Sequence, residues 1–367
     1  VLRPAVEFGS AEALRQALLP PVKRFIGEER GHIEAAHRQG TSGLDVVALH
    51  TDLVDAIICQ LFRFADAGLR QGVRDQTEGC AVVALGGYGR RELNPASDVD
   101  VMFLYSRHLD EYVSAVLNHV LYCLWDLGFT VGHSCRSLAD AARMMETDLT
   151  ARTSMLEARF LAGQPTVFAE MQERMWRGLQ GRRGQQYIAE KLEEQGRRHQ
   201  KYGGSVYLQE PNVKEGPGGL RDFHVAVWVA RARHRVADLA DLSSLNLLTP
   251  VELGQCVQAL DFLLRVRSEL HYLQAGKHDV LSLAVQVPVA ASLGFCDGPK
   301  YGVEQFMRQY YLRAGGLHQL SRRVTERCAE RSGSSVEAMM KKLRARDIGD
   351  DFVELNRQIH ILPAQRE

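Results

Sequence analysis

The sequence predicts an α+β protein in which a small α/β unit with a mixed sheet lies between an N-terminal helical segment and a larger C-terminal helical domain. Apolar residues recur at helical spacing over most of the chain, and two short apolar strands interrupt that pattern early. Aromatic residues make up only 7% of the chain, fewer than an all-β protein normally uses. A length of 367 residues also favours more than one domain. The predicted divisions are 1–75 (helical segment), 76–165 (α/β unit), 166–330 (helical domain) and 331–367 (linker).

Composition limits the classes of partner. The 45 basic residues equal the 45 acidic residues, whereas a dedicated nucleic-acid binder carries a basic excess, so no nucleic-acid partner is expected. The apolar runs, such as that from Val225 to Ala230, fall far short of the ~20 residues of a membrane span, so no membrane partner is expected either. Seven cysteines without a C-x-x-C pattern are typical of a reducing compartment, which predicts a cytoplasmic protein.

The N-terminal segment is predicted to be helical from its apolar spacing. Between residues 46 and 61 the apolar positions recur at steps of three and four, which marks one buried helix face. These positions are Val46, Leu49, Leu53, Val54, Ile57, Ile58 and Leu61.

The α/β unit begins where this spacing stops. Continuous apolar runs at 80–85 and 99–105 predict two buried strands. The helical pattern at 113–124 predicts a helix after the second strand. A third strand is expected after that helix, at 129–131. A capping-box pattern at Ser137 starts the next helix.

Helical spacing dominates from about residue 150 onward. Thr249 is predicted to cap a helix because Pro250 follows at the first helical position and Glu252 completes a capping box. Residues 331–346 are mostly polar and basic, which predicts a linker.

One stretch between the two predicted strands carries the strongest chemical signal. Gly86 and Gly87 end the first strand, and without side chains they let backbone N–H groups approach an anion. The segment Gly89–Leu93 is long enough for one helical turn, whose N-terminus would favour a phosphate group. Asn94-Pro95 breaks this turn and returns the chain to a strand.

Asp98 and Asp100 follow, two residues apart, so both carboxylates are predicted on one face. Such a pair repels unless a cation lies between its members, and Mg²⁺ or Mn²⁺ is the hard cation that oxygen ligands favour. A Rossmann fingerprint does not fit, because a charged turn and a proline follow the glycines, and the Gly-Lys-Ser/Thr of a P-loop is missing. The alternative is a tight turn with a solvated aspartate pair.

Two motifs resemble known families. The pattern G-G-x-G-R-x-E-(x)₄-S-D-x-D is similar to that of the nucleotidyltransferase superfamily that includes DNA polymerase β. The run Leu208-Gln-Glu-Pro-Asn-Val-Lys-Glu-Gly-Pro-Gly-Gly-Leu-Arg-Asp222 resembles the signature of the PII uridylyltransferase/uridylyl-removing enzymes of bacterial nitrogen control. The resemblance extends over about residues 45–330.

The resemblance implies a polymerase β-like nucleotidyltransferase domain that moves UMP from UTP to a tyrosine hydroxyl of the signal protein PII and releases pyrophosphate. Asp98 and Asp100 would be the catalytic residues and the ligands of Mg²⁺ or Mn²⁺. Gly86 and Gly87 would hold the phosphates, and Ser97 would either donate a hydrogen bond or belong to a local turn.

The second motif supplies further nucleotide-binding candidates. Lys214 and Arg221 are predicted to reach triphosphate oxygens, with Asp222 orienting one of them. The alternative is that this loop only braces two domains. Arg90 and Glu92 are expected to stabilise the glycine turn rather than to touch the nucleotide.

Two departures from the family pattern stand out. The superfamily usually has a third carboxylate on a following strand, but the matching segment here contains His133 and no acid. Either Glu146 or Asp148 substitutes for it, or the site works with two carboxylates, and the general base stays unassigned. The family also continues into a hydrolase domain and two glutamine-sensing domains, so the chain is expected to be the front part of a longer enzyme or a short relative. The dipeptide His278-Asp279 is interpreted as a chance match to a hydrolase site.

Two other functions stay open at this point. One is the related adenylyltransferase that acts on glutamine synthetase, although the 208–222 motif fits the uridylyl enzymes better. The other is a catalytically silent nucleotide-sensing module, because the third carboxylate is missing.

Overall fold

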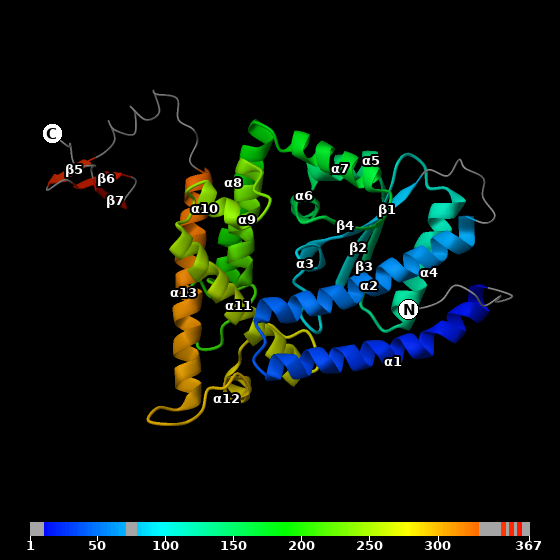
Figure 1. The fold of residues 1–367 in the computed structure, drawn as a ribbon. Helices are drawn as coiled ribbons and strands as arrows, with labels where there is room; N and C mark the ends of the chain where they lie inside the picture. Colours follow the sequence, from blue (N-terminus) through cyan, green and yellow to red (C-terminus); the bar gives the residue numbers. More distant parts are fainter. Residues whose placement is uncertain (1–10, 71–78, 330–345, 350–351, 356–357, 362–367) are drawn as a thin grey trace.

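The computed structural model describes residues 11–70, 79–329, 346–349, 352–355 and 358–361, and it confirms the α+β class (Figure 1). The helices run in chain order as α1 (Ala11–Arg38), α2 (Gly43–Arg70), α3 (Gly86–Gly89), α4 (Glu111–Asp126), α5 (Leu138–Thr147), α6 (Leu149–Leu156), α7 (Pro165–Gly178), α8 (Arg182–Lys201), α9 (Leu220–His234), α10 (Ala240–Ser244), α11 (Pro250–Leu273), α12 (Leu283–Ser292) and α13 (Gly302–Ala329).

A mixed four-stranded sheet forms the α/β part. It has the strand order β3-β2-β1-β4, in which β1 pairs antiparallel with β2 and β4 while β2 and β3 run parallel. Its strands are β1 (Cys80–Ala84), β2 (Val99–Tyr105), β3 (Val131–Ser137) and β4 (Arg159–Gly163). The parallel pair needs a crossover, and α4 provides it.

Alternation along the central strands divides the sheet between two hydrophobic clusters. Val82 and Phe103 point into a cluster with apolar residues of α1, α2 and α4. Val83 and Met102 point to the opposite face, into a larger cluster that takes in α5, α7 and the C-terminal helices. The sheet is therefore covered on both faces, and its second face shares one core with the helical region.

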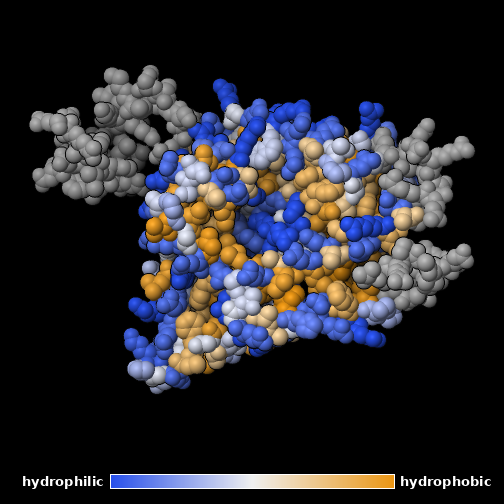
Figure 2. All heavy atoms as spheres, in the orientation of Figure 1, coloured by the Kyte–Doolittle hydropathy of each residue, from blue (hydrophilic) through white to orange (hydrophobic). Residues whose placement is uncertain are grey.

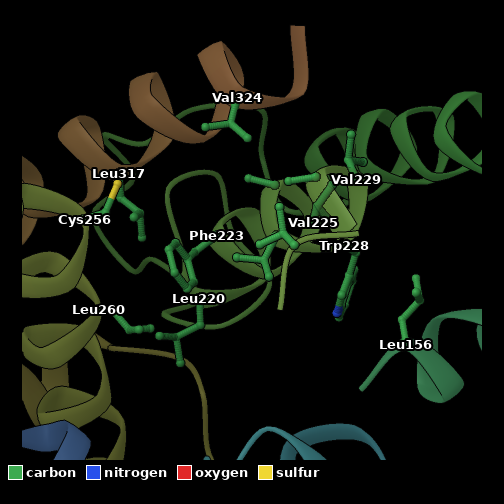
Figure 3. Close-up of a cluster of buried hydrophobic side chains, with 14 of the residues drawn as sticks. Leu156, Leu220, Phe223, Val225, Trp228, Val229, Cys256, Leu260, Leu317 and Val324 are labelled. Atoms are coloured by element: carbon green, nitrogen blue, oxygen red, sulfur yellow. The ribbon is translucent and has the colours of Figure 1, made fainter. Parts of the chain in front are cut away.

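Helix α9 is the centre of that larger core. Eleven of its residues are buried, and it packs most extensively against α13 and α8. Figure 3 shows Leu220 and Phe223 of α9 facing Leu260 of α11 and Leu317 of α13, with Trp228 further along the same helix. A helix buried on nearly every side brings its polar residues into the interior as well, and each of them needs a partner there.

The glycine turn differs in position from the prediction. The single helical turn expected at 89–93 lies at Gly86–Gly89 instead. Gly86 has a φ of 57°, a conformation open to glycine at little cost, so the chain can leave β1 and turn at once.

The third strand was also misplaced by the prediction. It was expected at 129–131 but extends from Val131 to Ser137, paired along its whole length with β2. Its sequence, Val-Gly-His-Ser-Cys-Arg-Ser, lacks an apolar run because it is an edge strand with mostly half-exposed residues.

The predicted linker is only partly within the described residues. Residues 331–345 lie outside them, whereas β5 (Arg346–Gly349), β6 (Phe352–Leu355) and β7 (Gln358–Ile361) form an antiparallel three-stranded sheet that the prediction did not include. Across the part of the chain that the structure describes, no helix is both long and apolar enough to span a bilayer.

Candidate active site

The glycine turn and Asp100 form one compact site. Leu85, the last residue before α3, donates its backbone N–H to the Asp100 carbonyl oxygen at 2.9 Å. A Cβ added to Gly86 would lie 3.2 Å from the Asp100 carboxylate, so a side chain there would crowd the acid. Gly87 is the next residue of the same turn. The sequence motif thus brings a bare backbone turn directly beside a carboxylate.

A second glycine closes the other side of this carboxylate. Asp100 pairs with Gly132 across the parallel strands, and a Cβ on Gly132 would lie only 2.2 Å from Asp100 Oδ1. The Asp100 carboxylate therefore occupies a slot that two glycines leave open. Asp98 lies in the loop immediately before β2 rather than within the strand.

The two carboxylates act on each other electrostatically. Burial raises the pKa of Asp100, and the Asp98 carboxylate raises it further. The charges of Lys277, Lys214 and Arg90 oppose this rise. The aspartate pair therefore faces positive groups from three separate segments, as a site for a metal ion and a polyanion requires.

Lys277 is a site residue that the sequence analysis missed. Its ammonium group donates a hydrogen bond to the Asp98 carboxylate, 179 positions away in the sequence. Both side chains are partly exposed, at 46% and 37%, so this contact is open to solvent and exchangeable. Only the tertiary fold brings the two residues together, and no local pattern around Lys277 signals it.

Lys277 lies in the segment between α11 and α12 (residues 274–282). Hydrogen bonds and an ion pair fix this segment to the loop before β2 (residues 90–98), called the aspartate loop below. Arg267 of α11 donates to Asn94 Oδ1 at 2.6 Å and to Asp279 Oδ1 at 2.7 Å. His271 Nδ1 accepts a hydrogen bond from the backbone N–H of Ala96 at 3.2 Å. Burial raises the pKa of Asp279, but His271 and Arg267 outweigh burial and hold it well below the usual range. Asp279 is thus an ionised structural anchor.

Arg90 and Glu92 stabilise the turn, as predicted. Arg90 Nε donates to Glu92 at 2.9 Å, and its guanidinium also donates to the buried Glu157. Glu92 lies 2.7 Å from His224 Nε2. Burial raises the pKa of Glu92, but His224 and Arg90 outweigh it and keep the carboxylate ionised. Trp228 of α9 donates its indole N–H to Glu157, which connects the turn to the helical core.

The 208–222 loop lies against the segment that carries Lys277 (residues 274–282). The Val213 backbone N–H donates a hydrogen bond to the Asp279 carbonyl oxygen at 2.8 Å. This places Lys214 near the aspartates. Burial and the charge of Arg267 lower the pKa of Lys214 to about 8. Arg221 donates to Glu215 at 3.1 Å, and its guanidinium lies 5.4 Å from the Trp228 ring centre.

Two predicted roles need comment. Asp222 was expected to orient Lys214 or Arg221, which is wrong: its carboxylate accepts hydrogen bonds from other groups, including Arg198 Nη2 at 2.5 Å. Ser97 Oγ accepts a hydrogen bond from the Asn94 backbone N–H at 3.1 Å, which is the local turn weighed as an alternative.

The candidates for a third carboxylate are used elsewhere. Glu146 accepts a hydrogen bond from Arg183 at 2.7 Å, and Asp148 caps α6 through the backbone N–H groups of Thr150 and Ala151. His133 pairs with Val101 on β2, so its side chain lies on the sheet face away from Asp100. The centre of its ring is 5.6 Å from that of the Trp125 ring.

The donor set fits a hard divalent cation. Two carboxylates lie together, one with a raised pKa that a cation would lower, in a slot kept free of side chains by Gly86 and Gly132. In Figure 2 hydrophilic side chains gather in a hollow near the middle of the face shown, between α9 and α3 of Figure 1.

Comparison with known proteins agrees with this chemistry. Residues 186–325 match the family described as GlnD PII-uridylyltransferase, and residues 30–138 match one described as putative nucleotidyltransferase DUF294. The chain is 37% identical to a protein of Rhodospirillum rubrum over 84% of its length and 34% identical to one of Rhodopseudomonas palustris over 96%. Both relatives are named bifunctional uridylyltransferase/uridylyl-removing enzyme. The chain spans 33% and 39% of their respective lengths.

Proposed function

Because the chain is related in sequence to the PII uridylyltransferase/uridylyl-removing enzymes, we propose that it is a nucleotidyltransferase that moves UMP from UTP to a tyrosine hydroxyl of PII. The tyrosine oxygen forms a bond to the α-phosphorus, and the bond from that phosphorus to the bridging oxygen breaks, which releases pyrophosphate. The observation that supports this most directly is the Asp98/Asp100 pair beside the Gly86 turn. We also propose the cytoplasm as the location.

The residues divide the work by their chemistry. Asp98 and Asp100 would hold Mg²⁺ or Mn²⁺, which supplies Lewis-acid stabilisation of the phosphate charge and lowers the pKa of the attacking hydroxyl. Gly86 and Gly87 would offer backbone N–H groups to the phosphates at the start of α3.

Cationic side chains would bind the rest of the triphosphate. Lys214 of the 208–222 loop and Lys277 of the segment between α11 and α12 act electrostatically on Asp100 from the helical region. Arg221 belongs to the same loop motif as Lys214 and would bind the outer phosphates. We propose that residues 76–165 form the nucleotidyltransferase domain, which supplies the carboxylates, and that residues 166–330 form the helical domain, which supplies Lys214, Arg221 and Lys277. Ser97 would act on the site only indirectly, by shaping the loop that presents Asp98.

Transfer of label tests this proposal. The chain is incubated with PII, or in a parallel reaction with glutamine synthetase, together with Mg²⁺ and α-labelled UTP or ATP. An Asp98→Asn/Asp100→Asn variant and a Glu170→Gln control on the exposed face of α7 are assayed beside it. Label on PII from UTP, lost in the double variant and kept in the control, supports the proposal. Preference for ATP, with transfer to glutamine synthetase, would favour the related adenylyltransferase. Metal-dependent nucleotide binding without any transfer would favour a silent sensing module.

A further inference from the structure

A second cluster of metal-ligating side chains lies outside the candidate active site. We propose that His199, Asp222 and His318 bind a divalent transition-metal ion such as Zn²⁺ or Co²⁺. This proposal does not depend on the nucleotidyltransferase activity, because none of the three residues belongs to the aspartate pair or to its lysines.

The three side chains converge from separate helices. His199 comes from α8, Asp222 from the first turn of α9 and His318 from α13, and their ligand atoms all lie within 4.8 Å of one another. His199 Nε2 is 2.7 Å from Asp222 Oδ1, and His318 Nδ1 is 2.9 Å from Oδ2. The ring centres of the imidazoles are 5.5 Å apart. Small shifts of the two rings would place an ion between the three groups.

The donor set determines which ion fits. Two imidazole nitrogens with one carboxylate form a three-ligand set of the kind that binds zinc and leaves a fourth position open. Imidazole also favours transition metals over Mg²⁺, so the cluster and the aspartate pair would select different ions. The Asp222 side chain is 0% exposed, whereas those of His199 and His318 are 21% and 31% exposed, so an ion can enter from solvent.

Asp222 is held in place without the imidazoles. Its Oδ1 also accepts hydrogen bonds from Gln195 at 3.1 Å and Arg198 at 2.5 Å, and its Oδ2 accepts one from the Gly218 backbone N–H at 2.8 Å. Such outer hydrogen bonds orient a metal-binding carboxylate. Burial raises the pKa of Asp222, but the two histidines and Arg198 outweigh it, so the carboxylate is ionised at neutral pH.

Each facing imidazole nitrogen carries either a proton or a lone pair, according to the tautomer of the ring. An ion takes the lone-pair form of both rings, so binding releases any proton on those nitrogens. The positive charge of Arg198 opposes the ion, so we expect reversible binding rather than a permanent structural metal. A bound ion would join α8 and α13 to the start of α9, directly after the loop that carries Lys214 and Arg221.

Cobalt absorption tests the proposal. Co²⁺ is titrated into the Asp98→Asn/Asp100→Asn variant, in which the aspartate pair no longer competes for the ion. We expect one equivalent to bind with the visible bands of nitrogen-ligated Co²⁺. A variant that also carries His199→Gln and His318→Asn should lose them. The amide nitrogens of Gln and Asn replace Nε2 and Nδ1 as hydrogen-bond donors but are poor ligands, so this variant separates metal binding from the hydrogen bonds.

Thermal unfolding gives a second readout. Zn²⁺ should raise the melting temperature of the chain with intact histidines and leave that of the His199→Gln/His318→Asn variant unchanged. Circular dichroism without metal should be the same for both. The proposal is overturned if the aspartate double variant binds no Co²⁺, or if replacing the histidines leaves the cobalt bands and the zinc-induced shift intact.

Discussion

Gly132 offers a direct test of how the Asp100 carboxylate is positioned. In Gly132→Ala the new Cβ would lie 2.2 Å from Asp100 Oδ1, whereas ordinary contact begins at 3.4 Å. The carboxylate must therefore move by about 1.2 Å. A misplacement of about 1 Å at a reacting centre can lower the rate by ~10²-fold. The displaced atoms belong to a rotatable, half-buried side chain, so the free energy of unfolding should change by no more than about 1 kcal/mol.

The assay measures the rate of UMP transfer to PII together with urea unfolding of the same samples. Gly254→Ala in α11 is the matched control, because a Cβ at Gly254 meets nothing within 4 Å and should leave transfer unchanged. Transfer by Gly132→Ala at the wild-type rate, with stability intact, would show that the slot does not set the position of Asp100. A large loss of stability would show that the strand pairing, and not the carboxylate, gave way.

Three further predictions concern the lysines and the helical region. The pKa of Lys214 is lowered from 10.5 to about 8, so its charge costs stability below pH 8, and stability should rise between pH 8 and 10.5. UTP affinity, measured by calorimetry, should in contrast fall about tenfold per pH unit above pH 8, because Lys214 loses its charge there. Lys214→Arg should remove this fall, because arginine stays charged. An unchanged pH profile of UTP affinity in that variant would assign the titration to another group. Lys277→Met should strengthen Mn²⁺ binding to the free chain, measured by electron paramagnetic resonance, by no more than about fivefold, because the exposed ion pair with Asp98 is worth at most ~1 kcal/mol. The same substitution should weaken UTP binding, because it removes a positive charge from the site. A change of both affinities in the same direction would argue against competition between Lys277 and the ion for Asp98. Thr249→Ala removes a complete capping box and should lower the free energy of unfolding by about 1 kcal/mol in urea, whereas Thr249→Ser should stay near wild type; equal stability of the two variants would contradict the role of the cap.

Local signals in the sequence were sufficient for several elements. The apolar run at 80–85 became β1, and Thr249 forms the predicted capping box with Glu252. The motif around Gly86 was also sufficient to predict a turn without side chains beside Asp100, because the effect of glycine on the backbone is local. Such features need no distant partner, so they can be predicted from a short window.

Other features depend on contacts between distant segments. β3 was predicted too short because an edge strand with one half-exposed face has no apolar run to mark it. Lys277 meets Asp98 only after α11 packs against the aspartate loop through Arg267 and Asn94. Asp222 likewise depends on distant contacts. Its position within a family motif suggested that it orients a nucleotide-binding side chain, whereas its carboxylate contacts His199 of α8 and His318 of α13.

The apolar cluster that joins the sheet to the helices has a consequence for how the protein unfolds and for where the chain can be truncated. Met102 of β2 and Trp228 of α9 belong to the same cluster. The sheet therefore has no independent interior on that side, and a fragment ending near residue 165 would expose this face to water. We expect the described sheet and helices up to α13 to melt in one cooperative transition. A core substitution in α11 would then lower the temperature up to which the Asp98/Asp100 site stays folded, although the substituted residue does not contact that site.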